Sequence, residues 1–268
     1  QTYDAFSITN KSLPDTTLFY ANVNNVNRIF GEDSANGDHD HSTHLINAKY
    51  SGLGLGTLTA YAYLVDNEDA AAFSSDTYGL RFAGGKELKE GIKAVYEAEW
   101  ATQSDADDNT TDYDADYYHL VGGLNVKGVT VKVGYEVLES DDDADVSGSA
   151  TQQAFATPLA TLHKFNGWSD KFLATPAMGI EDTYITIGGK LADVKLLAVY
   201  HEYSSNVDNI STGNSADYGD EYGLVVSKKF DNYGLAVKYS RFDADEAFTG
   251  TGDGTDVSKL WVTGTAKF

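Results

Sequence analysis

Hydrophobic and polar positions alternate without interruption along the last residues of the chain, 256–268. Leu260 and Val262 fall on one face of this alternation, whereas Lys259 and Lys267 fall on the other. A period of two residues is typical of a β-strand whose two faces meet different surroundings. A tilted strand of about 9–11 residues is long enough to cross a bilayer. The pattern therefore predicts either the closing strand of an outer-membrane β-barrel or an edge strand of a soluble β-sandwich.

Similar alternating segments recur along the whole chain, and turn-forming residues separate them. We expect about 13 strands, within a range of roughly 12–14, from this periodicity. They cover residues 2–9, 16–30, 42–51, 57–65, 77–84, 92–100, 117–124, 129–138, 183–190, 194–203, 221–229, 233–242 and 256–268. The sequence contains no apolar run of about 18 residues, so it predicts no transmembrane helix.

The connections between the expected strands alternate regularly between short turns and long acidic loops. Residues 125–128 and 191–193 are examples of the short turns, and residues 31–41 and 204–219 are examples of the loops. Outer-membrane barrels have short turns at the periplasmic end and longer loops at the extracellular end. In a soluble sandwich, we expect no such separation of short and long connections between the two ends. The fold class predicted is all-β, a transmembrane antiparallel up-and-down β-barrel. Residues 1–268 form one domain with a long inserted loop at 139–182.

An odd number of strands conflicts with the even numbers found in bacterial single-chain barrels. If the C-terminus lies in the periplasm, the first expected strand begins at the extracellular end of the barrel. We therefore expect either that one strand is misplaced or that these strands are part of a larger barrel and lack its N-terminal strands.

Charge and composition exclude several other classes of protein. The formal net charge is −22 and the isoelectric point is near 4.4, which argues against nucleic-acid binding because that needs a basic face. The chain has no cysteine, so disulfides and thiolate metal sites are excluded. No nucleophile motif, phosphate-binding loop or dinucleotide fingerprint occurs, so we predict neither an enzyme nor a cofactor.

The histidines at one end of the acidic loop 31–41 are the best candidates for a metal site. His39 and His41 lie in the run Asp-His-Asp-His at 38–41, and His44 follows. Hard cations need oxygen ligands that are held rigidly, and no EF-hand or nonapeptide repeat is present. A solvated loop is the interpretation we adopt, with weak calcium binding by the acidic loops as the alternative.

In the last strand, apolar residues lie on one face and lysines lie on the other. The same division, applied to the other strands, assigns each of them a lipid side and a lumen side. Val131, Val133 and Leu235 are examples of the side that we expect to contact outer-membrane lipid. A barrel of more than about eight strands is too wide to be filled by side chains, so charged residues on the other side are expected to line a hydrated pore. They are Lys49, Arg81, Lys93, Glu97, Glu99, Lys132, Glu136, Lys195, His201, Glu221, Lys238, Lys259 and Lys267. Alternatively, Lys93 or Lys132 pairs with a glutamate of the same wall and only stabilises it.

The second part of the long loop, residues 155–176, is apolar and aromatic. An apolar loop of a barrel has only the barrel mouth to bury against, so we expect it to fold inward as a constriction or plug. Thr157 and Pro158 are suited to begin a short helix, and Gly167 is suited to end it. The candidates for solute contact in this constriction loop are His163, Lys164, Trp168 and Lys171. The alternative is an extracellular cap that packs on neighbouring loops.

Three stretches carry a resemblance to a known family. Residues 155–176, with the pattern TPLATLHKFNGW followed by DKFLATP, and residues 9–18 and 24–30 resemble the alginate-export family of outer-membrane porins. The resemblance implies a larger barrel with more N-terminal strands, and passage of an anionic polysaccharide through constrictions lined by arginine and lysine. This chain departs from that pattern because it has only three arginines, Arg28, Arg81 and Arg241.

These features predict a passive channel in the outer membrane of a Gram-negative bacterium. The expected solutes are small molecules or oligosaccharides, with a preference for anions. The rival hypothesis is a non-conducting structural or adhesive barrel whose acidic loops bind calcium or a partner. The pattern predicts no particular oligomeric state.

Overall fold

The computed structural model describes residues 1–268 except 32, 35–36, 147, 161 and 246–254. One antiparallel sheet dominates it, in which neighbours along the chain pair in the order β1-β2-β3-β4-β5-β6-β8-β9-β14-β15-β16-β17-β18. The strands are β1 (Thr2–Asn10), β2 (Thr16–Asn27), β3 (Asp38–Tyr50), β4 (Gly56–Val65), β5 (Ser75–Lys89), β6 (Ile92–Asp105), β8 (Asp114–Val126), β9 (Val129–Leu138), β14 (Ile180–Leu191), β15 (Val194–Ser204), β16 (Asp217–Phe230), β17 (Tyr233–Ala244) and β18 (Val257–Ala266).

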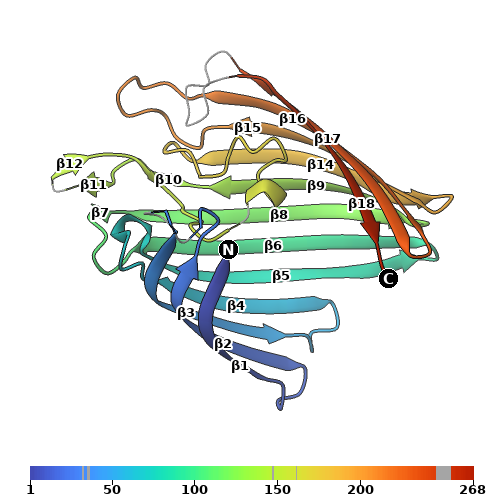
Figure 1. Cartoon of the computed structure of the whole chain (residues 1–268), viewed down its shortest axis with the longest axis horizontal. Coiled ribbons are helices and arrows are strands. Elements are labelled where there is room, and N and C mark those ends of the chain that lie inside the picture. Colours follow the sequence, from blue (N-terminus) through green and yellow to red (C-terminus); the bar gives the residue numbers. More distant parts are fainter. Residues whose placement is uncertain (32, 35–36, 147, 161, 246–254) are drawn as a thin grey trace.

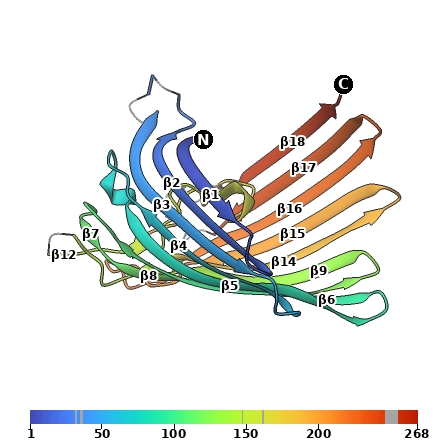
Figure 2. The same cartoon turned by 90° about the horizontal axis from the view of Figure 1, so that it is seen from below.

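The sheet curves into an open wall, and its two edge strands are β1 and β18. Figures 1 and 2 show the strands running side by side, with β1 and β18 on the two arms of the curve. Long connections gather at one end of the wall and short turns gather at the other. The strong right-handed twist of neighbouring strands accumulates into curvature of this kind. The 13-stranded antiparallel sheet confirms the predicted fold class.

The observed strands differ from the predicted ones chiefly at their ends. β2 ends at Asn27, not at residue 30. β5 continues to Lys89, across the turn that we expected from residue 85, because Lys89 still pairs with Ile92 after a bulge. Gly91, with a φ of 73°, then makes the turn. Most of the connection between the last two predicted strands, 233–242 and 256–268, lies outside the described residues.

The long loops carry small sheets of their own and two short 3-10 helices. The helices are η1 (Ala71–Phe73) and η2 (Leu162–Lys164). The small strands are β7 (Thr111–Asp112), β10 (Ser140–Asp141), β11 (Asp145–Val146), β12 (Ser149–Ala150) and β13 (Gln153–Ala154). β10 pairs with β13, and β11 pairs with both β12 and β7. Among the described residues, no helix is long and apolar enough to cross a membrane.

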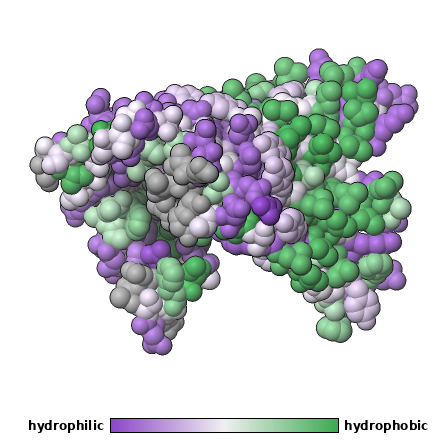
Figure 3. Space-filling model, turned by 90° about the horizontal axis from the view of Figure 1, so that it is seen from above, coloured by the Kyte–Doolittle hydropathy of each residue, from purple (hydrophilic) through white to green (hydrophobic). Residues whose placement is uncertain are grey.

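Apolar side chains cover the convex face of the wall. Val133 on β9 is 53% exposed, and its register partners Gly122 and Ile185 extend the same face onto β8 and β14. The space-filling view shows hydrophobic residues gathered toward the end with the short turns, and hydrophilic residues at the tips and at the loop end (Figure 3). Large apolar side chains exposed over so wide an area are unusual for a soluble domain.

Two glycines on the concave face lie under tyrosine rings of the neighbouring strand. A Cβ at Gly79 would lie 2.1 Å from the ring of Tyr61, and a Cβ at Gly134 would lie 2.1 Å from the ring of Tyr184. In both cases the tyrosine is the direct register partner of the glycine. Glycine within a strand often marks such a close approach of another group. The two phenol rings can therefore lie flat against the wall.

The hydrophobic core sits at the loop end, between the strands and the inserted loop. Phe172 of the loop is 2% exposed, and its ring lies 4.7 Å from that of Tyr203 and 5.8 Å from that of Phe242. Tyr218 and Ile180 complete the buried cluster around it. Burying an aromatic side chain of this size stabilises its position by about 2–3 kcal/mol. The inserted loop is thus packed against the wall.

The helix that we predicted from Thr157 to Gly167 is wrong in extent. Thr157 instead begins a turn that the amide of Ala160 closes, and only η2 is helical. Gly167 has a φ of 95°, and Asp170 has a φ of 60°. Contacts with the wall dictate these backbone angles, so tertiary structure overrides the local helix signal.

Candidate functional site

Residues 155–160 and 162–175, which we call the inner segment, lie on the concave side of the wall. Figures 1 and 2 both show this part of the chain within the curve of the sheet. The backbone amides of Trp168 and Ser169 donate hydrogen bonds to the two carboxylate oxygens of Glu221 on β16, at 2.5 and 2.9 Å. The hydroxyl of Ser169 donates a hydrogen bond to the hydroxyl of Ser240 on β17 at 2.9 Å. Glu221 is only 1% exposed, so this anchor is shielded from water.

A second anchor joins the inner segment to β17 and β18 through charged groups. Nδ1 of His163 lies 2.5 Å from Asp170, and Nε2 of His163 lies 2.6 Å from the ammonium of Lys238. The other carboxylate oxygen of Asp170 accepts a hydrogen bond from Lys259 at 2.6 Å. Burial opposes ionisation of Asp170, but the hydrogen bonds from Lys259 and His163 outweigh it, and the pKa of this carboxyl lies below its usual range. Asp170 therefore bridges the segment and β18 as a carboxylate.

The two ends of the inner segment lie close together at the loop end of the wall. The hydroxyl of Thr175 donates to the carbonyl of Phe155 at 2.9 Å. The side-chain amide of Gln103 on β6 forms two hydrogen bonds with the backbone of Ala156. Its oxygen accepts from the N–H of Ala156 at 2.7 Å, and its nitrogen donates to the carbonyl of Ala156 at 3.0 Å. Residues 156–174 therefore form a loop that leaves the wall and returns to it at almost the same point.

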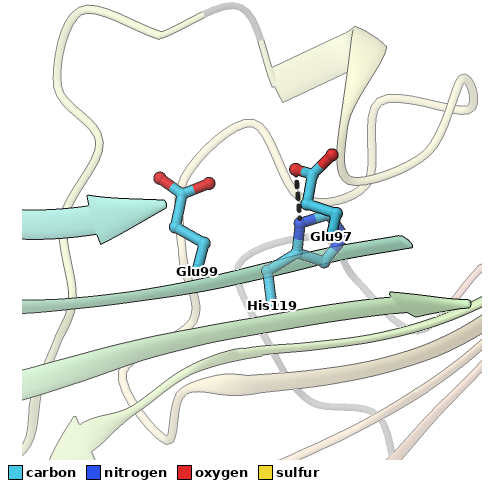
Figure 4. Close-up of side chains that lie close together, drawn as sticks. All are labelled: Glu97, Glu99 and His119. Atoms are coloured by element: carbon cyan, nitrogen blue, oxygen red, sulfur yellow. Dashed lines mark ion pairs between the residues drawn. The ribbon is translucent and has the colours of Figure 1, made fainter. Parts of the chain in front are cut away.

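Next to the segment, the wall carries a cluster of ionisable groups on β5, β6 and β8. Arg81 lies 2.7 Å from Glu97 and 3.3 Å from Glu99. Nδ1 of His119 lies 3.5 Å from Glu97, and Figure 4 shows the three side chains Glu97, Glu99 and His119 on neighbouring strands. The hydroxyl of Tyr61 donates to Glu99 at 2.7 Å. The ligand atoms of the two glutamates and the histidine are close enough to hold a metal ion, but the guanidinium already supplies a positive charge there.

The polar surface continues across β9, β14 and β15. The hydroxyl of Tyr117 donates to Glu136 at 2.6 Å, and the side-chain amide of Asn166 in the inner segment reaches the same carboxylate at 3.3 Å. Asp182, which is fully buried, lies 2.8 Å from Nδ1 of His201. Buried charged groups persist in proteins when they are paired and hydrogen-bonded. The buried carboxylates of this part of the concave side are thus each hydrogen-bonded.

The structure brings one group of the predicted pore residues together around the inner segment. Glu136, Glu221, Lys238 and Lys259 contact the segment directly. His201 stacks on Tyr203 next to it, with ring centroids 5.3 Å apart.

Other predicted residues lie apart from the segment. Lys49, Lys93, Lys132 and Lys195 are exposed, and Lys267 follows the last residue of β18. Arg81, and neither Lys93 nor Lys132, forms the described ion pairs with the glutamates of β6.

The four predicted contact residues of the segment also have different surroundings. His163 and Trp168 both face Lys238, whose ammonium lies 5.3 Å from the ring centroid of Trp168. Lys171 lies 5.5 Å from the ring of Phe242. Lys164 is exposed and lies over the ring of Phe165. Among the described contacts, those of His163 and Trp168 with Lys238 belong to the charged anchor.

Sequence reasoning missed several groups that the structure places at this site. Asp170 is the central carboxylate of the second anchor, and Asp182 and His119 belong to the wall. His119 could have been found, because it alternates with the apolar residues Tyr118 and Leu120 on β8. Asp170 carried no such signal, since its partner on the wall, Lys259, lies 89 positions away in the chain.

The sequence matches no known family model and no curated protein sequence. Solved structures do resemble the fold. OccAB4 of Acinetobacter baumannii has 12% sequence identity and a TM-score of 0.71, and the match covers 99% of this chain and 65% of that one. OpdQ of Pseudomonas aeruginosa has 11% identity and a TM-score of 0.72, with coverages of 99% and 69%. The outer membrane protein OprD of the same species has 11% identity and a TM-score of 0.66, with coverages of 97% and 67%.

These similarities concern the fold, and the chain spans about two thirds of the length of the structures that it matches. They support the predicted porin architecture, whereas they do not support the particular resemblance to the alginate-export family, because the matched structures are of the OprD and Occ type. The antiparallel sheet, the sorted connections and the apolar convex face agree with that architecture. The chain therefore has the fold of outer-membrane porins.

Proposed function

We propose that this protein is a channel for small solutes in the outer membrane of a Gram-negative bacterium, and that the inner segment forms its constriction. The proposal rests on one observation above all: a loop of the extracellular end is anchored on the polar concave wall by Glu221 and by Asp170. A polar wall of more than about eight strands encloses water. A segment fixed on such a wall narrows the water-filled passage that the wall surrounds.

The charges of the wall support a preference for anionic solutes. Lys132 and Lys195 are exposed on the concave face and take part in none of the described ion pairs. The two glutamates of β6, in contrast, are both paired with Arg81, whose single positive charge offsets half of theirs. Small anions and anionic oligosaccharides fit this distribution, and the polysaccharide implied by the sequence resemblance is one member of that class.

Planar-bilayer recording of the complete natural protein tests the proposal. We expect stepwise insertion events, each giving a stable conductance, and a reversal potential in a salt gradient that indicates anion preference. Absence of conductance would favour the rival function, a structural or adhesive barrel whose acidic loops bind a partner. Conductance with cation preference would retain the channel and refute the anionic preference.

The apolar convex face gives a separate prediction about contact with lipid. Replacing Val133, 53% exposed on that face, with arginine should reduce the free energy of unfolding in lipid vesicles by about 2–4 kcal/mol, the cost of a cation near the middle of a bilayer. Thr186→Arg is the matched control, because Thr186 lies on the adjacent strand and its register partner is Lys132 of the concave face. Equal effects of both variants in urea titrations would contradict the assignment of the faces.

A further inference from the structure

The contact between His163 and Lys238 fixes where the proton of the imidazole lies. A lysine ammonium has only donors, so at a distance of 2.6 Å it must donate to a lone pair on Nε2 of His163. A neutral imidazole with a lone pair on Nε2 carries its proton on Nδ1. Nδ1 faces the carboxylate of Asp170 at 2.5 Å and can donate to it. With Lys238 as an ammonium, the arrangement therefore requires a neutral His163.

A second proton on His163 has only one place to bind. It must occupy Nε2, the atom at which the ammonium of Lys238 already points. Asp170 compensates the new positive charge on His163, but it does not restore the acceptor that Lys238 loses. Two cations would then be in contact, which a half-buried site tolerates poorly because screening by water is weak there. Protonation of His163 must therefore separate it from Lys238.

The surroundings of the pair come from three strands. β17 contributes Lys238, β18 contributes Lys259 and the ring of Trp261, and β16 contributes Glu221. The ammonium of Lys238 lies 4.2 Å from the ring centroid of Trp261. Cation–π contact with a tryptophan is favourable, and the lysine already makes this contact, so it keeps a favourable partner when the contact with His163 is lost. Glu221 is already occupied by the amides of Trp168 and Ser169.

The net charge of the anchor changes with this proton. With neutral His163, two lysines and one aspartate give +2 − 1 = +1. With protonated His163 the sum becomes +2. Asp170 remains ionised in mild acid, because hydrogen bonds from Lys259 and His163 hold its pKa below the usual range despite burial. The carboxylate therefore does not cancel the added charge.

We infer that His163 sets the ion selectivity of the constriction, acting as a proton-dependent specificity residue that holds Lys238 when neutral and releases it when protonated. This inference rests on the proposed channel function. Histidine is the side chain whose charge ordinarily changes between about pH 5 and pH 8. Acid therefore adds a positive charge to the narrowest part of the passage and moves its preference further toward anions.

The test is the reversal potential of the complete protein in a potassium chloride gradient, recorded at about pH 8 and about pH 5. We expect the chloride-to-potassium permeability ratio to rise severalfold in acid. In the variant His163→Gln this rise should be lost, because a glutamine carbonyl still accepts from Lys238 but does not titrate. His44→Gln is the control, since His44 is bonded to Tyr20 far from the segment, and it should keep the pH response.

The possible results separate this inference from the proposed function. A permeability ratio that does not change with pH, or one that changes equally in His163→Gln, overturns the inference and leaves the channel intact. Absence of conductance at both pH values overturns the channel and the inference together. A rise in the natural protein and in His44→Gln, but not in His163→Gln, supports both.

Discussion

Deleting residues 156–174 is expected to raise the single-channel conductance severalfold. This stretch leaves the wall next to Phe155 and returns at Thr175, and those two residues are hydrogen-bonded at 2.9 Å. A short glycine linker can therefore replace it without moving the strands. The sheet itself is held by its own ladder of backbone hydrogen bonds and should still fold. Single-channel recording in planar bilayers measures the effect directly.

A deletion in another loop provides the matched control. Residues 210–213 lie between Asn209 and Asn214. The backbone groups of these two asparagines are hydrogen-bonded at 3.0 Å, so the residues on either side of this deletion also lie close together. Removing these residues should leave the conductance unchanged, because the described contacts of this loop do not include Glu221, Lys238 or Lys259. If deletion of 156–174 also left it unchanged, the segment would not lie in the passage.

Glu221→Ala is expected to release the inner segment from the wall. Its carboxylate accepts hydrogen bonds from the amides of Trp168 and Ser169, and the residue is 1% exposed. Each hydrogen bond to a charged group contributes about 1.5–3 kcal/mol, so losing both should weaken docking of the segment by about 3–6 kcal/mol. We expect a noisier open-channel current and faster proteolysis within the segment.

Two further variants make this result specific. Glu221→Gln retains one carbonyl acceptor of the same shape, so its effect should be intermediate. Glu202→Gln removes an exposed carboxylate from the neighbouring strand β15, and it should leave both the current noise and the proteolysis rate unchanged. An undisturbed segment in Glu221→Ala would show that Phe172 and Asp170 alone are enough to hold it.

The strands and their order could be predicted because their signals are local. Alternation along β9 and β18, and the glycine or asparagine turns between paired strands, follow from residues that are close in the chain. The sorted lengths of the connections also follow from the local sequence, and the predicted orientation of the barrel rests on them. Ends such as that of β5 were missed because cross-strand pairing between Lys89 and Ile92 decided them, and not local sequence.

The contacts of the candidate site could not be predicted in the same way. His163 and Lys238 are separated by 75 positions, and Asp170 and Lys259 by 89. Such pairings depend on where the inner segment crosses the wall, which no periodicity encodes. Arg81 was assigned to the same side as Glu97 and Glu99, but its pairing with both glutamates depends on side-chain reach across β5 and β6.

In the proposed channel, the tyrosines that lie flat over glycines also determine how wide the passage is. At Gly134, any larger side chain would push the phenol of Tyr184 off the wall and toward the lumen, since a Cβ would lie 2.1 Å from its ring. Gly79 has the same relation to Tyr61. The diameter of the passage therefore depends on uncharged glycines and tyrosines, whereas the electrostatic potential inside it depends on Arg81, Lys238 and their partners. Mutation can thus alter size exclusion and ion preference independently.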